Sequence, residues 1–249
     1  MGENVFEKLE EKIKKYPLFL QDYYFSSKKS RGEKIRSFCS GIPINSIILE
    51  GACGKISRIR EYNSNNSNIR MLVGIDLLIG SIKLNNDLDF KVVADLENLP
   101  FKESYFDVVN LPYVVEHLQN PEKVFKEVGY ALKKGGLLLV ITKNIYNPIM
   151  AVNKILPLKI RFWVKKYILR YPGHLLDTFP APYRCNSSMK INKVLISLGF
   201  KKEQIWHYGS PLFFTPSIGL FFSMIYEKLT DKKWLRFSKP DFCAKFQKT

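Results

Sequence analysis

Three short apolar runs in the first half of the chain each end in a carboxylate residue, at the spacing of successive β-α-β steps. The runs cover residues 47–50, 71–76 and 90–95, and they end in Glu50, Asp76 and Asp95. In an open parallel sheet, ligands bind beyond the carboxyl ends of the strands, where the strand order reverses. We therefore expect the three acids to line one crevice at one edge of a parallel sheet.

The alternation of strand-like and helix-like segments continues to residue 142. Pro121 occupies the first position of a predicted helix, as prolines often do. Gly135-Gly136 then precedes an uninterrupted apolar strand at 137–142, a pattern typical of a strand buried on both faces. This alternation predicts an α/β fold with a mostly parallel sheet that helices cover on both sides.

The 249 residues suffice for one large domain, and we predict a single domain over 1–249. Its parts are a helical lead-in at 1–45, a ligand-binding half at 46–142, and two insertions at 143–185 and 211–238 on the substrate side. The insertions interrupt the alternation with prolines and with apolar and basic-aromatic stretches.

The net charge of +16 is unevenly distributed: +3 over 1–46, −1 over 47–142 and +14 over 143–249. A strongly basic region favours anionic substrates, anionic lipid headgroups or nucleic acid. The alternative is a general compositional bias toward Lys, Asn and Ile. The basic-aromatic stretch 158–171 has a broad apolar arc at helical spacing, which suits packing on the sheet, a substrate or a membrane surface.

Several classes of protein are excluded by what the sequence lacks. The first residues show no apolar signal-peptide core, and the apolar runs are too short to span a bilayer, so we expect a cytoplasmic protein. The four cysteines form no CxxC pair, which predicts free thiols and no metal site. The chain has no phosphate loop of the GxxxxGK type, no HExxH motif and no GxSxG motif.

The stretch from Ile47 to Thr142 resembles the class I S-adenosylmethionine-dependent methyltransferases. The motifs that carry the resemblance are Leu49-Glu50-Gly51-Ala52-Cys53-Gly54, Gly74-Ile75-Asp76, Asp95-Leu96 with Leu99-Pro100-Phe101, Phe106-Asp107-Val108-Val109, Val115-Glu116-His117 and Leu132-Lys133-Lys134-Gly135-Gly136. The segment from Phe179 to Asn186, followed by a helix and Gly199-Phe200, is similar to bacterial members found among glycan and exopolysaccharide biosynthesis enzymes. The resemblance implies a Rossmann-like seven-stranded sheet of order 3-2-1-4-5-7-6 with an antiparallel last strand.

The three acids suit a ligand with a cationic group, a ribose diol and a base amino group, and S-adenosylmethionine has all three. By the resemblance, Glu50 acts on the ammonium side, Asp76 accepts both ribose hydroxyls and Asp95 accepts the adenine amino group. A single acid after a strand is otherwise most simply a helix cap. The predicted cofactor-binding residues are Glu50, Gly51, Ala52, Cys53, Gly54, Asp76, Leu77, Asp95, Leu96, Asn110 and Leu111.

A hydroxyl acceptor needs a base to remove its proton. His117, shortly after the fourth strand, is the first candidate, and His174 with Asp177 is the second; either histidine can instead have a structural role. Tyr113, Tyr183 and Arg184 are candidate substrate contacts, because the planar guanidinium of arginine suits a phosphate or carboxylate.

The sequence thus predicts methyl transfer to a hydroxyl of a saccharide or of a lipid-linked, anionic glycan. The expected partners are that acceptor and a membrane surface contacted peripherally, without nucleic acid. One alternative acceptor is a quinone or another small apolar molecule. Another alternative is a non-catalytic cofactor-binding homologue, because Ile56 stands where the family usually carries a glycine.

Overall fold

The structure is a computed structural model that describes residues 10–11, 13–39, 41–62, 68–164, 167, 180–209 and 217–249. The chain divides into two compact units, which we treat separately. The helical unit comprises residues 1–33, 145–181 and 207–241, and the sheet unit comprises residues 34–144, 182–206 and 242–249. The two predicted insertions overlap the two internal segments of the helical unit. The predicted single domain over 1–249 stays a prediction.

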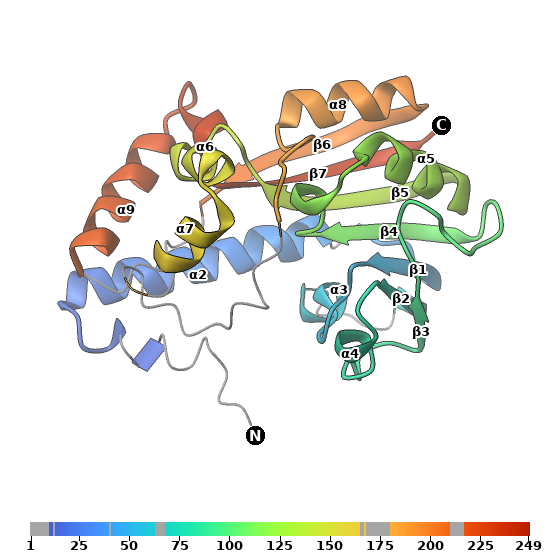
Figure 1. The fold of residues 1–249 in the computed structure, drawn as a ribbon, viewed down its shortest axis with the longest axis horizontal. Helices are drawn as coiled ribbons and strands as arrows, with labels where there is room; N and C mark the ends of the chain where they lie inside the picture. Colours follow the sequence, from blue (N-terminus) through green and yellow to red (C-terminus); the bar gives the residue numbers. More distant parts are fainter. Residues whose placement is uncertain are drawn as a thin grey trace. The chain divides into compact units, whose positions relative to one another are not determined.

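The sheet unit contains the seven-stranded sheet, apart from the last two residues of β6 and the first of β7 (Figure 1). Its strands are β1 Ser46–Gly51, β2 Ile69–Asp76, β3 Phe90–Val93, β4 Phe106–Pro112, β5 Leu132–Lys143, β6 Phe200–Tyr208 and β7 Asp241–Lys248. The strand order is β3-β2-β1-β4-β5-β7-β6. The pairs β1–β2, β1–β4, β2–β3 and β4–β5 are parallel. The predicted mostly parallel, Rossmann-like sheet is confirmed.

Two helices pack together on one side of this sheet (Figure 1). They are α5 Pro121–Ala131 and α8 Ser188–Ser197. Val124 and Phe125 of α5 and Leu195 of α8 are buried in one core cluster with strand residues. Each helix begins at a polar cap, since a side-chain oxygen of Asn120 or Ser187 accepts a hydrogen bond from the backbone N–H three residues later.

The long helix α2 Leu18–Cys39 contributes its last six residues to the sheet unit. Ile35 and Phe38 are buried there, and the Phe38 ring lies 6.4 Å from that of Trp206 on β6. The sequence predicted a helical lead-in over 1–45, and the structure starts α2 directly after Pro17, where the fixed backbone angle of proline suits a helix start.

The helices that follow β1 and β2 are short: they are α3 Arg58–Tyr62 and α4 Ile79–Ile82. The strand predicted at 137–142 is longer in the structure, so Gly135 and Gly136 lie inside β5. Gly135 has a φ of 77°, and the ladder with β4 shifts register there. Only a residue without a side chain adopts this backbone conformation easily.

The helical unit contains the first part of α2 together with α6 Pro148–Ile155, α7 Leu158–Trp163, α9 Ser217–Thr230 and the short 3-10 turn η5 Arg236–Ser238. Leu20 and Tyr24 of α2 are buried against Leu220 of α9. The Glu227 carboxylate accepts hydrogen bonds from the hydroxyls of Tyr23 and Ser27, which joins the same two helices. Of the predicted basic-aromatic helix 158–171, the structure describes residues up to 164, and residue 167.

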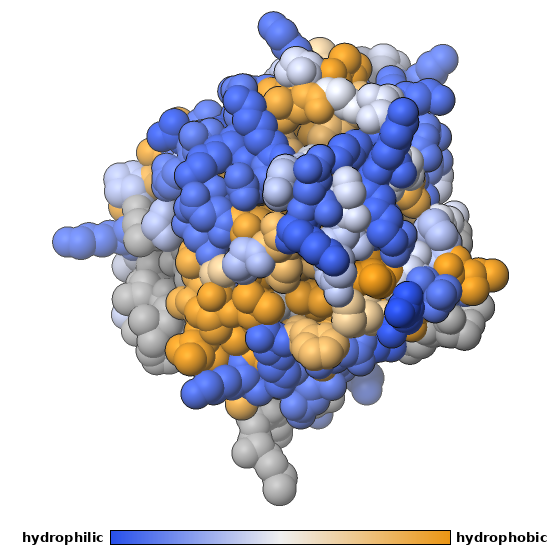
Figure 2. All heavy atoms as spheres, turned by 90° about the vertical axis from the view of Figure 1, so that its right-hand side faces the viewer, coloured by the Kyte–Doolittle hydropathy of each residue, from blue (hydrophilic) through white to orange (hydrophobic). Residues whose placement is uncertain are grey.

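Figure 2 shows apolar side chains gathered in the lower half of one face, at the height where Figure 1 places β3 and α4. The exposed large apolar residues of this part of the sheet unit are Leu77, Leu78, Ile79, Leu84, Phe90 and Val93. Over the described ranges, no helix is both long enough and apolar enough to cross a lipid bilayer.

Candidate cofactor site at the carboxyl edge of the sheet

The strand register brings the three predicted acids to one edge of the sheet. Glu50 on β1 pairs with Gly74 on β2, so Asp76 stands two residues further along the neighbouring strand. Asp76 in turn pairs with Val93 on β3, and Asp95 follows two residues later. Because these strands are parallel, all three acids lie where the strands end.

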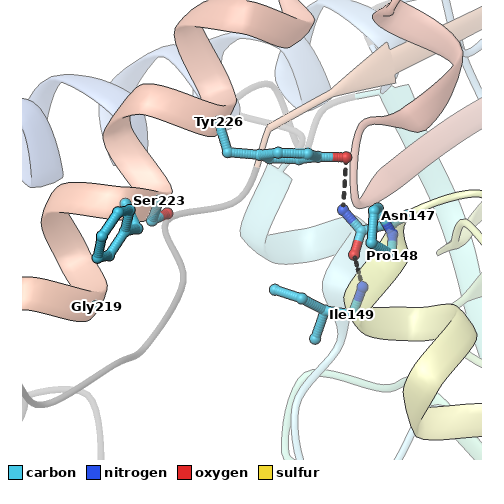
Figure 3. A pocket seen from close by; sticks show the side chains of 7 residues that line it. Asn147, Pro148, Ile149, Gly219, Ser223 and Tyr226 are labelled. Atoms are coloured by element: carbon cyan, nitrogen blue, oxygen red, sulfur yellow. Dashed lines mark hydrogen bonds between the residues drawn. The ribbon is translucent and has the colours of Figure 1, made fainter.

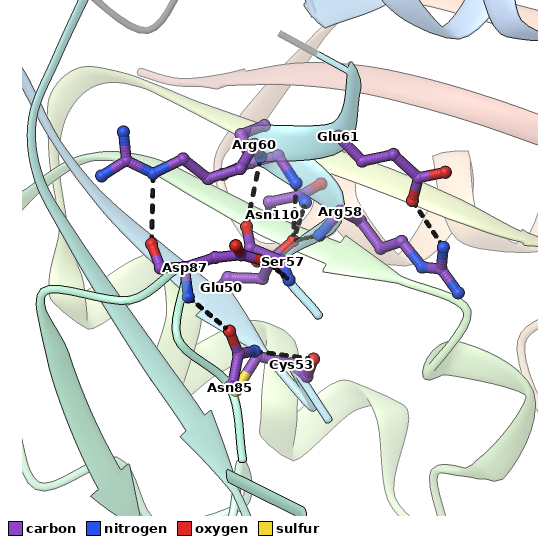
Figure 4. A network of polar contacts seen from close by, with 10 residues as sticks. Glu50, Cys53, Ser57, Arg58, Arg60, Glu61, Asn85, Asp87 and Asn110 are labelled. Atoms are coloured by element: carbon purple, nitrogen blue, oxygen red, sulfur yellow. Dashed lines mark hydrogen bonds and ion pairs between the residues drawn. The ribbon is translucent and has the colours of Figure 1, made fainter. Parts of the chain in front are cut away.

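Glu50 is completely buried and holds the start of α3 (Figure 4). Its Oε1 accepts hydrogen bonds from the backbone N–H groups of Arg58 and Ile59, each at 3.0 Å, and from Asn110 Nδ2 at 2.9 Å. Burial raises the pKa of Glu50 to about 7, against the lowering effects of the Ser57 hydroxyl and these donors. The first two backbone N–H groups of α3 are therefore bonded to Glu50.

Asp76 closes the turn that follows β1. Its Oδ2 accepts a hydrogen bond from Gly54 N at 2.9 Å, and its Oδ1 accepts one from Leu78 N at 2.8 Å. A carboxylate has about four acceptor positions, so Asp76 keeps roughly two for a ligand. The side chain is only half-buried and can be reached from solvent.

Two further side chains hold the same turn, and the sequence analysis did not single them out (Figure 4). The buried Asn85 donates from Nδ2 to the backbone oxygens of Cys53 at 3.4 Å and Gly54 at 3.2 Å. Asp87 accepts a hydrogen bond from Ser57 N at 2.9 Å. The only available signal was a pair of turn-forming polar residues between two predicted elements, which is also typical of an ordinary loop.

The remaining predicted cofactor residues divide into exposed and buried ones. Asp95 is exposed, with Oδ1 accepting a hydrogen bond from Glu97 N at 2.9 Å, and Leu77 is 65% exposed. Leu96 and Leu111 are buried, and both lie so close to Gly51 that a Cβ there would come within about 3 Å of each. Gly51 therefore lets the turn lie directly on the core, and Leu111 contributes core packing.

Cys53 is a buried core residue of this turn. Its Sγ lies against Gly74 on β2, at 2.8 Å from the position a Cβ would take there. Burial raises the pKa of the Cys53 thiol to about 12. The thiol is therefore protonated at neutral pH and packs as a small apolar group.

Three non-glycine residues of the sheet unit have left-handed backbone conformations near this edge: Ala52, Tyr113 and Tyr183, with φ between 50° and 53°. Ala52 lies in the turn after β1, and Tyr113 directly follows β4. Such conformations are costly for residues with side chains and gather at functional sites. Tyr113 and Tyr183 are two of the predicted substrate contacts.

On the predicted substrate side of this edge, a series of buried side chains is linked by hydrogen bonds. Glu116, in η2 Val115–His117, accepts a hydrogen bond from the Thr142 hydroxyl at 2.6 Å, and that hydroxyl accepts one from Asn186 Nδ2 at 2.7 Å. Tyr183 N donates to the backbone oxygen of Glu116 at 3.2 Å. Burial raises the pKa of Glu116, against the lowering effect of the Thr142 hydroxyl. The segment before α8 is thereby fixed to the ends of β4 and β5.

Of the two candidate bases, the structure describes His117 but not His174. His117 is half-buried at the end of η2, beside Glu116 in the chain. His174 and its neighbour Asp177 lie outside the described residues.

Arg184 is exposed, as the predicted contact with an anionic acceptor requires, and Ile56 is 55% exposed in the turn before α3. Within the described ranges, no group of three His, Cys, Asp or Glu side chains is arranged to hold a metal ion.

The groups at this edge fit the expected cofactor. They are mainly acceptors: the free positions of Asp76, the exposed Asp95 and the buried Asn110 Oδ1, which accepts no hydrogen bond from the described residues. S-adenosylmethionine offers donors to match, namely an ammonium group, two ribose hydroxyls and an adenine amino group. The exposed Leu77 and Leu78 beside Asp76 provide apolar surface for an aromatic ring.

The chain is similar to known methyltransferases over part of its length. Residues 49–140 match the family model described as a methyltransferase domain. The chain is 30% identical over 122 residues to the ubiquinone/menaquinone biosynthesis C-methyltransferase UbiE of Neisseria meningitidis serogroup C, covering 48% of this chain and 46% of that protein. It is 28% identical over 122 residues to the tRNA (carboxymethyluridine(34)-5-O)-methyltransferase of Arabidopsis thaliana, covering 47% and 29%. The chain thus spans less than half the length of these two relatives.

Among solved structures, an S-adenosylmethionine-dependent methyltransferase from Mesorhizobium loti has the same fold, with a TM-score of 0.56 at 15% identity, over 87% of this chain and 96% of that one. A likeness at this identity concerns the fold alone. Residues 49–140 thus match a methyltransferase domain, and the sheet around them has the strand order and fold of the S-adenosylmethionine-dependent methyltransferases.

Proposed function

We propose that the protein transfers the methyl group of S-adenosylmethionine to a hydroxyl of a saccharide or of a lipid-linked, anionic glycan. The observation that carries the methyl-transfer part is the placement of Glu50, Asp76 and Asp95 at one edge of three adjacent parallel strands. The saccharide acceptor is supported by the resemblance of the segment 179–186 to glycan biosynthesis enzymes, and by the basic C-terminal region.

Bound S-adenosylmethionine supplies a methyl group already activated by a sulfonium. The residues of the chain have to bind and orient it. Asp76 holds the ribose through the acceptor positions that the turn leaves open, and Asp95 binds the adenine amino group. Asn110, fixed by its hydrogen bond to Glu50, presents its buried Oδ1 to the amino acid end. Positioning of this kind supplies much of the rate when the leaving group is good.

His117 is the proposed base for the acceptor hydroxyl. The hydrogen bond from Thr142 to Glu116, next to His117 in the chain, fixes this stretch to β5. Tyr113 and Tyr183 form the proposed surroundings of the acceptor. Their left-handed backbone conformations support a role at the site, because the strain has to be maintained by the surrounding structure.

A second candidate acceptor is a quinone-like apolar ring. It is favoured by the curated relatives, of which several are ubiquinone/menaquinone biosynthesis C-methyltransferases. The exposed apolar side chains of α6, α7 and α9 also suit an acceptor that resides in a membrane. A carbon acceptor of this kind needs the same cofactor site and a different substrate side.

The test is methyl transfer from radiolabelled S-adenosylmethionine to two acceptors in parallel: a polyprenyl-linked saccharide and a demethylated naphthoquinol. We expect label in the saccharide, and we expect His117→Ala to lower kcat with little change in the KM for S-adenosylmethionine. If only the naphthoquinol is labelled, the saccharide acceptor is contradicted and the quinone-like acceptor is supported instead. Transfer to neither acceptor, together with no measurable binding of S-adenosylmethionine, would contradict methyl transfer itself.

A further inference from the structure

A pocket of about 260 Å³ lies within the helical unit, where the start of α6 faces α9 (Figure 3). It is lined by residues 147–149 and by Gly219, Phe222, Ser223 and Tyr226. Pro148, Ile149 and Phe222 give it an apolar lining. Pockets for whole small molecules typically enclose about 300–1,000 Å³, so this one suits a slender group.

The amide of Asn147, at one end of the pocket, has no capacity left for a ligand. Its Oδ1 accepts hydrogen bonds from the backbone N–H groups of Ile149 at 3.1 Å and Met150 at 3.3 Å. Its Nδ2 donates to Tyr226 Oη at 3.3 Å and to the backbone oxygen of Ser238 at 3.2 Å. An amide has two acceptor and two donor positions, and all four are used here.

The two hydroxyls in the pocket lining also use their hydrogens within the protein. Tyr226 donates its single hydroxyl hydrogen to the backbone oxygen of Ser238 at 2.7 Å. Tyr23 donates to Glu227, so in the 3.4 Å contact between Tyr23 and Ser223 the donor is Ser223. The side chains of the pocket therefore offer a ligand no free donor, and the occupant that fits is a hydrocarbon.

The rim of the pocket and its surroundings are apolar and exposed. Phe222 is 62% exposed, Ile218 next to Gly219 is 64% exposed, and Ile149 is 37% exposed. Further exposed apolar side chains on the same helices are Val152, Ile155, Phe221, Ile225 and Leu229. Apolar surface of this extent, bordered by polar residues, marks an interaction site.

The charges on these elements are almost all positive. Residues 145–164 and 217–239 carry eight basic side chains and two acidic ones. Both acids are engaged, since Glu227 accepts from the hydroxyls of Tyr23 and Ser27, and Asp231 pairs with Lys239 at 2.8 Å. Lys228, Lys232 and Lys233 are exposed beside Trp234, a combination typical of segments that lie at a membrane surface.

We propose that α6 and α9 form a binding site for an anionic lipid, in which the pocket takes one hydrocarbon chain and the lysines that follow contact the headgroup. The proposal rests on the helical unit alone and needs neither the cofactor nor methyl transfer. It commits to lipid because the lining is largely apolar and offers no free hydrogen-bond donor, and because the surrounding charge complements an anionic surface.

The probe is lysophosphatidylglycerol, which has one chain and one negative charge, below its micellar concentration. Binding to the full-length protein is measured by isothermal titration calorimetry without S-adenosylmethionine. The pocket variant is Gly219→Leu, which places a side chain in the pocket at a helical position. The matched control is Gly80→Leu on α4, where an added Cβ meets nothing within 4 Å.

We expect Gly219→Leu to weaken binding by roughly tenfold or more, since each buried methylene of a lipid chain contributes about 0.8 kcal/mol. Gly80→Leu should bind as the wild type does. The triple change Lys228→Gln, Lys232→Gln and Lys233→Gln should weaken binding to vesicles of phosphatidylcholine with phosphatidylglycerol on the order of a hundredfold. Vesicles of phosphatidylcholine alone should bind weakly.

Three outcomes would overturn the proposal. Equal lysolipid binding by the wild type and Gly219→Leu would exclude the pocket as the chain site. Equal vesicle binding after loss of the three lysines would exclude the headgroup contact. Self-association of the protein that Phe222→Ser abolishes, without any lipid binding, would assign the apolar surface to a second copy of the chain. Failure of methyl transfer with intact lipid binding would contradict the proposed function alone.

Discussion

The two units use their hydrogen-bonding side chains in opposite ways. In the sheet unit, Asp76 accepts hydrogen bonds from two backbone N–H groups and Asp95 from one, and both carboxylates still have acceptor positions open at the end of a strand. In the helical unit, Asn147 and Tyr226 satisfy one another and the backbone, and the surface around them is apolar. The first arrangement suits a ligand rich in donors, and the second suits a hydrocarbon.

The largest expected effect is a loss of stability when a buried acceptor of the sheet unit is removed. Glu50→Ala removes the acceptor of three buried donors, and we expect the free energy of unfolding to fall by about 3 kcal/mol. Urea unfolding followed by circular dichroism measures it. Glu50→Gln keeps an oxygen for the two backbone N–H groups and should recover most of this loss. Equal stability of Glu50→Ala and the wild type would contradict the role of this carboxylate.

The same residue predicts a pH dependence. Burial raises the pKa of Glu50 in the folded protein to about 7, from its ordinary value of 4.5. Between these values the folded state binds the extra proton, so stability falls as the pH rises through this window and levels off above it. Glu50→Gln should remove this slope from unfolding curves measured between pH 4.5 and 7.5. A slope that persists unchanged would assign the titration to other groups.

Loss of Asp76 should lower the affinity for the cofactor more than it lowers the stability of the fold. Asp76→Ala removes the proposed ribose acceptors and releases the Gly54 N–H, so we expect the affinity for S-adenosylmethionine to fall on the order of a hundredfold. Isothermal titration measures the affinity. Glu122→Ala, on the exposed side of α5, is the control and should leave the affinity unchanged.

A substitution of Asn85 tests whether side chains other than the three acids at the strand ends hold the turn after β1. Asn85→Ala removes its contacts to Cys53 O and Gly54 O, and should lower the free energy of unfolding by about 2 kcal/mol. Cofactor affinity should also fall, by roughly tenfold, because the turn is a proposed contact of the ligand. Asn98→Ala, at an exposed site, should change neither quantity. If Asn85→Ala binds the cofactor with unaltered affinity, the turn after β1 is not part of the cofactor site.

In the helical unit the corresponding effect is smaller. Tyr226→Phe removes one hydrogen bond to Ser238 O and frees a donor of Asn147, so we expect a loss of about 1 kcal/mol in thermal or urea unfolding. Tyr130→Phe, half-exposed on α5, is the control. No difference between the two variants would mean that the network around Asn147 adds nothing to stability.

The smallest effect concerns Ile56, the departure from the family pattern. The side chain is more than half exposed, and α3 begins two residues later, so Ile56 lies in the turn before the helix. Ile56→Gly should therefore change cofactor affinity by less than about threefold. A gain of tenfold or more would show that this side chain obstructs the pocket.

Much of the sheet unit could be predicted from the sequence, because parallel strands are continuous apolar runs and their order follows from the family motifs. The roles of Asn85 and Asp87 could not, since short polar loops look alike until the turn they hold is known. The start of α2 at Leu18 and the pocket beside α6 were also missed. Both depend on which distant segments pack together, as Leu20 does with Leu220, and local spacing carries no signal for that.

The central claim is that Asp76, Asp95 and Asn110, which Glu50 holds in place, surround one molecule of S-adenosylmethionine. A crystal structure of the protein with S-adenosylhomocysteine tests it most directly. We expect the ribose hydroxyls within hydrogen-bond distance of Asp76, the adenine amino group beside Asp95 and the amino acid end near Asn110. A nucleoside bound away from the ends of β1, β2 and β3 would contradict the account.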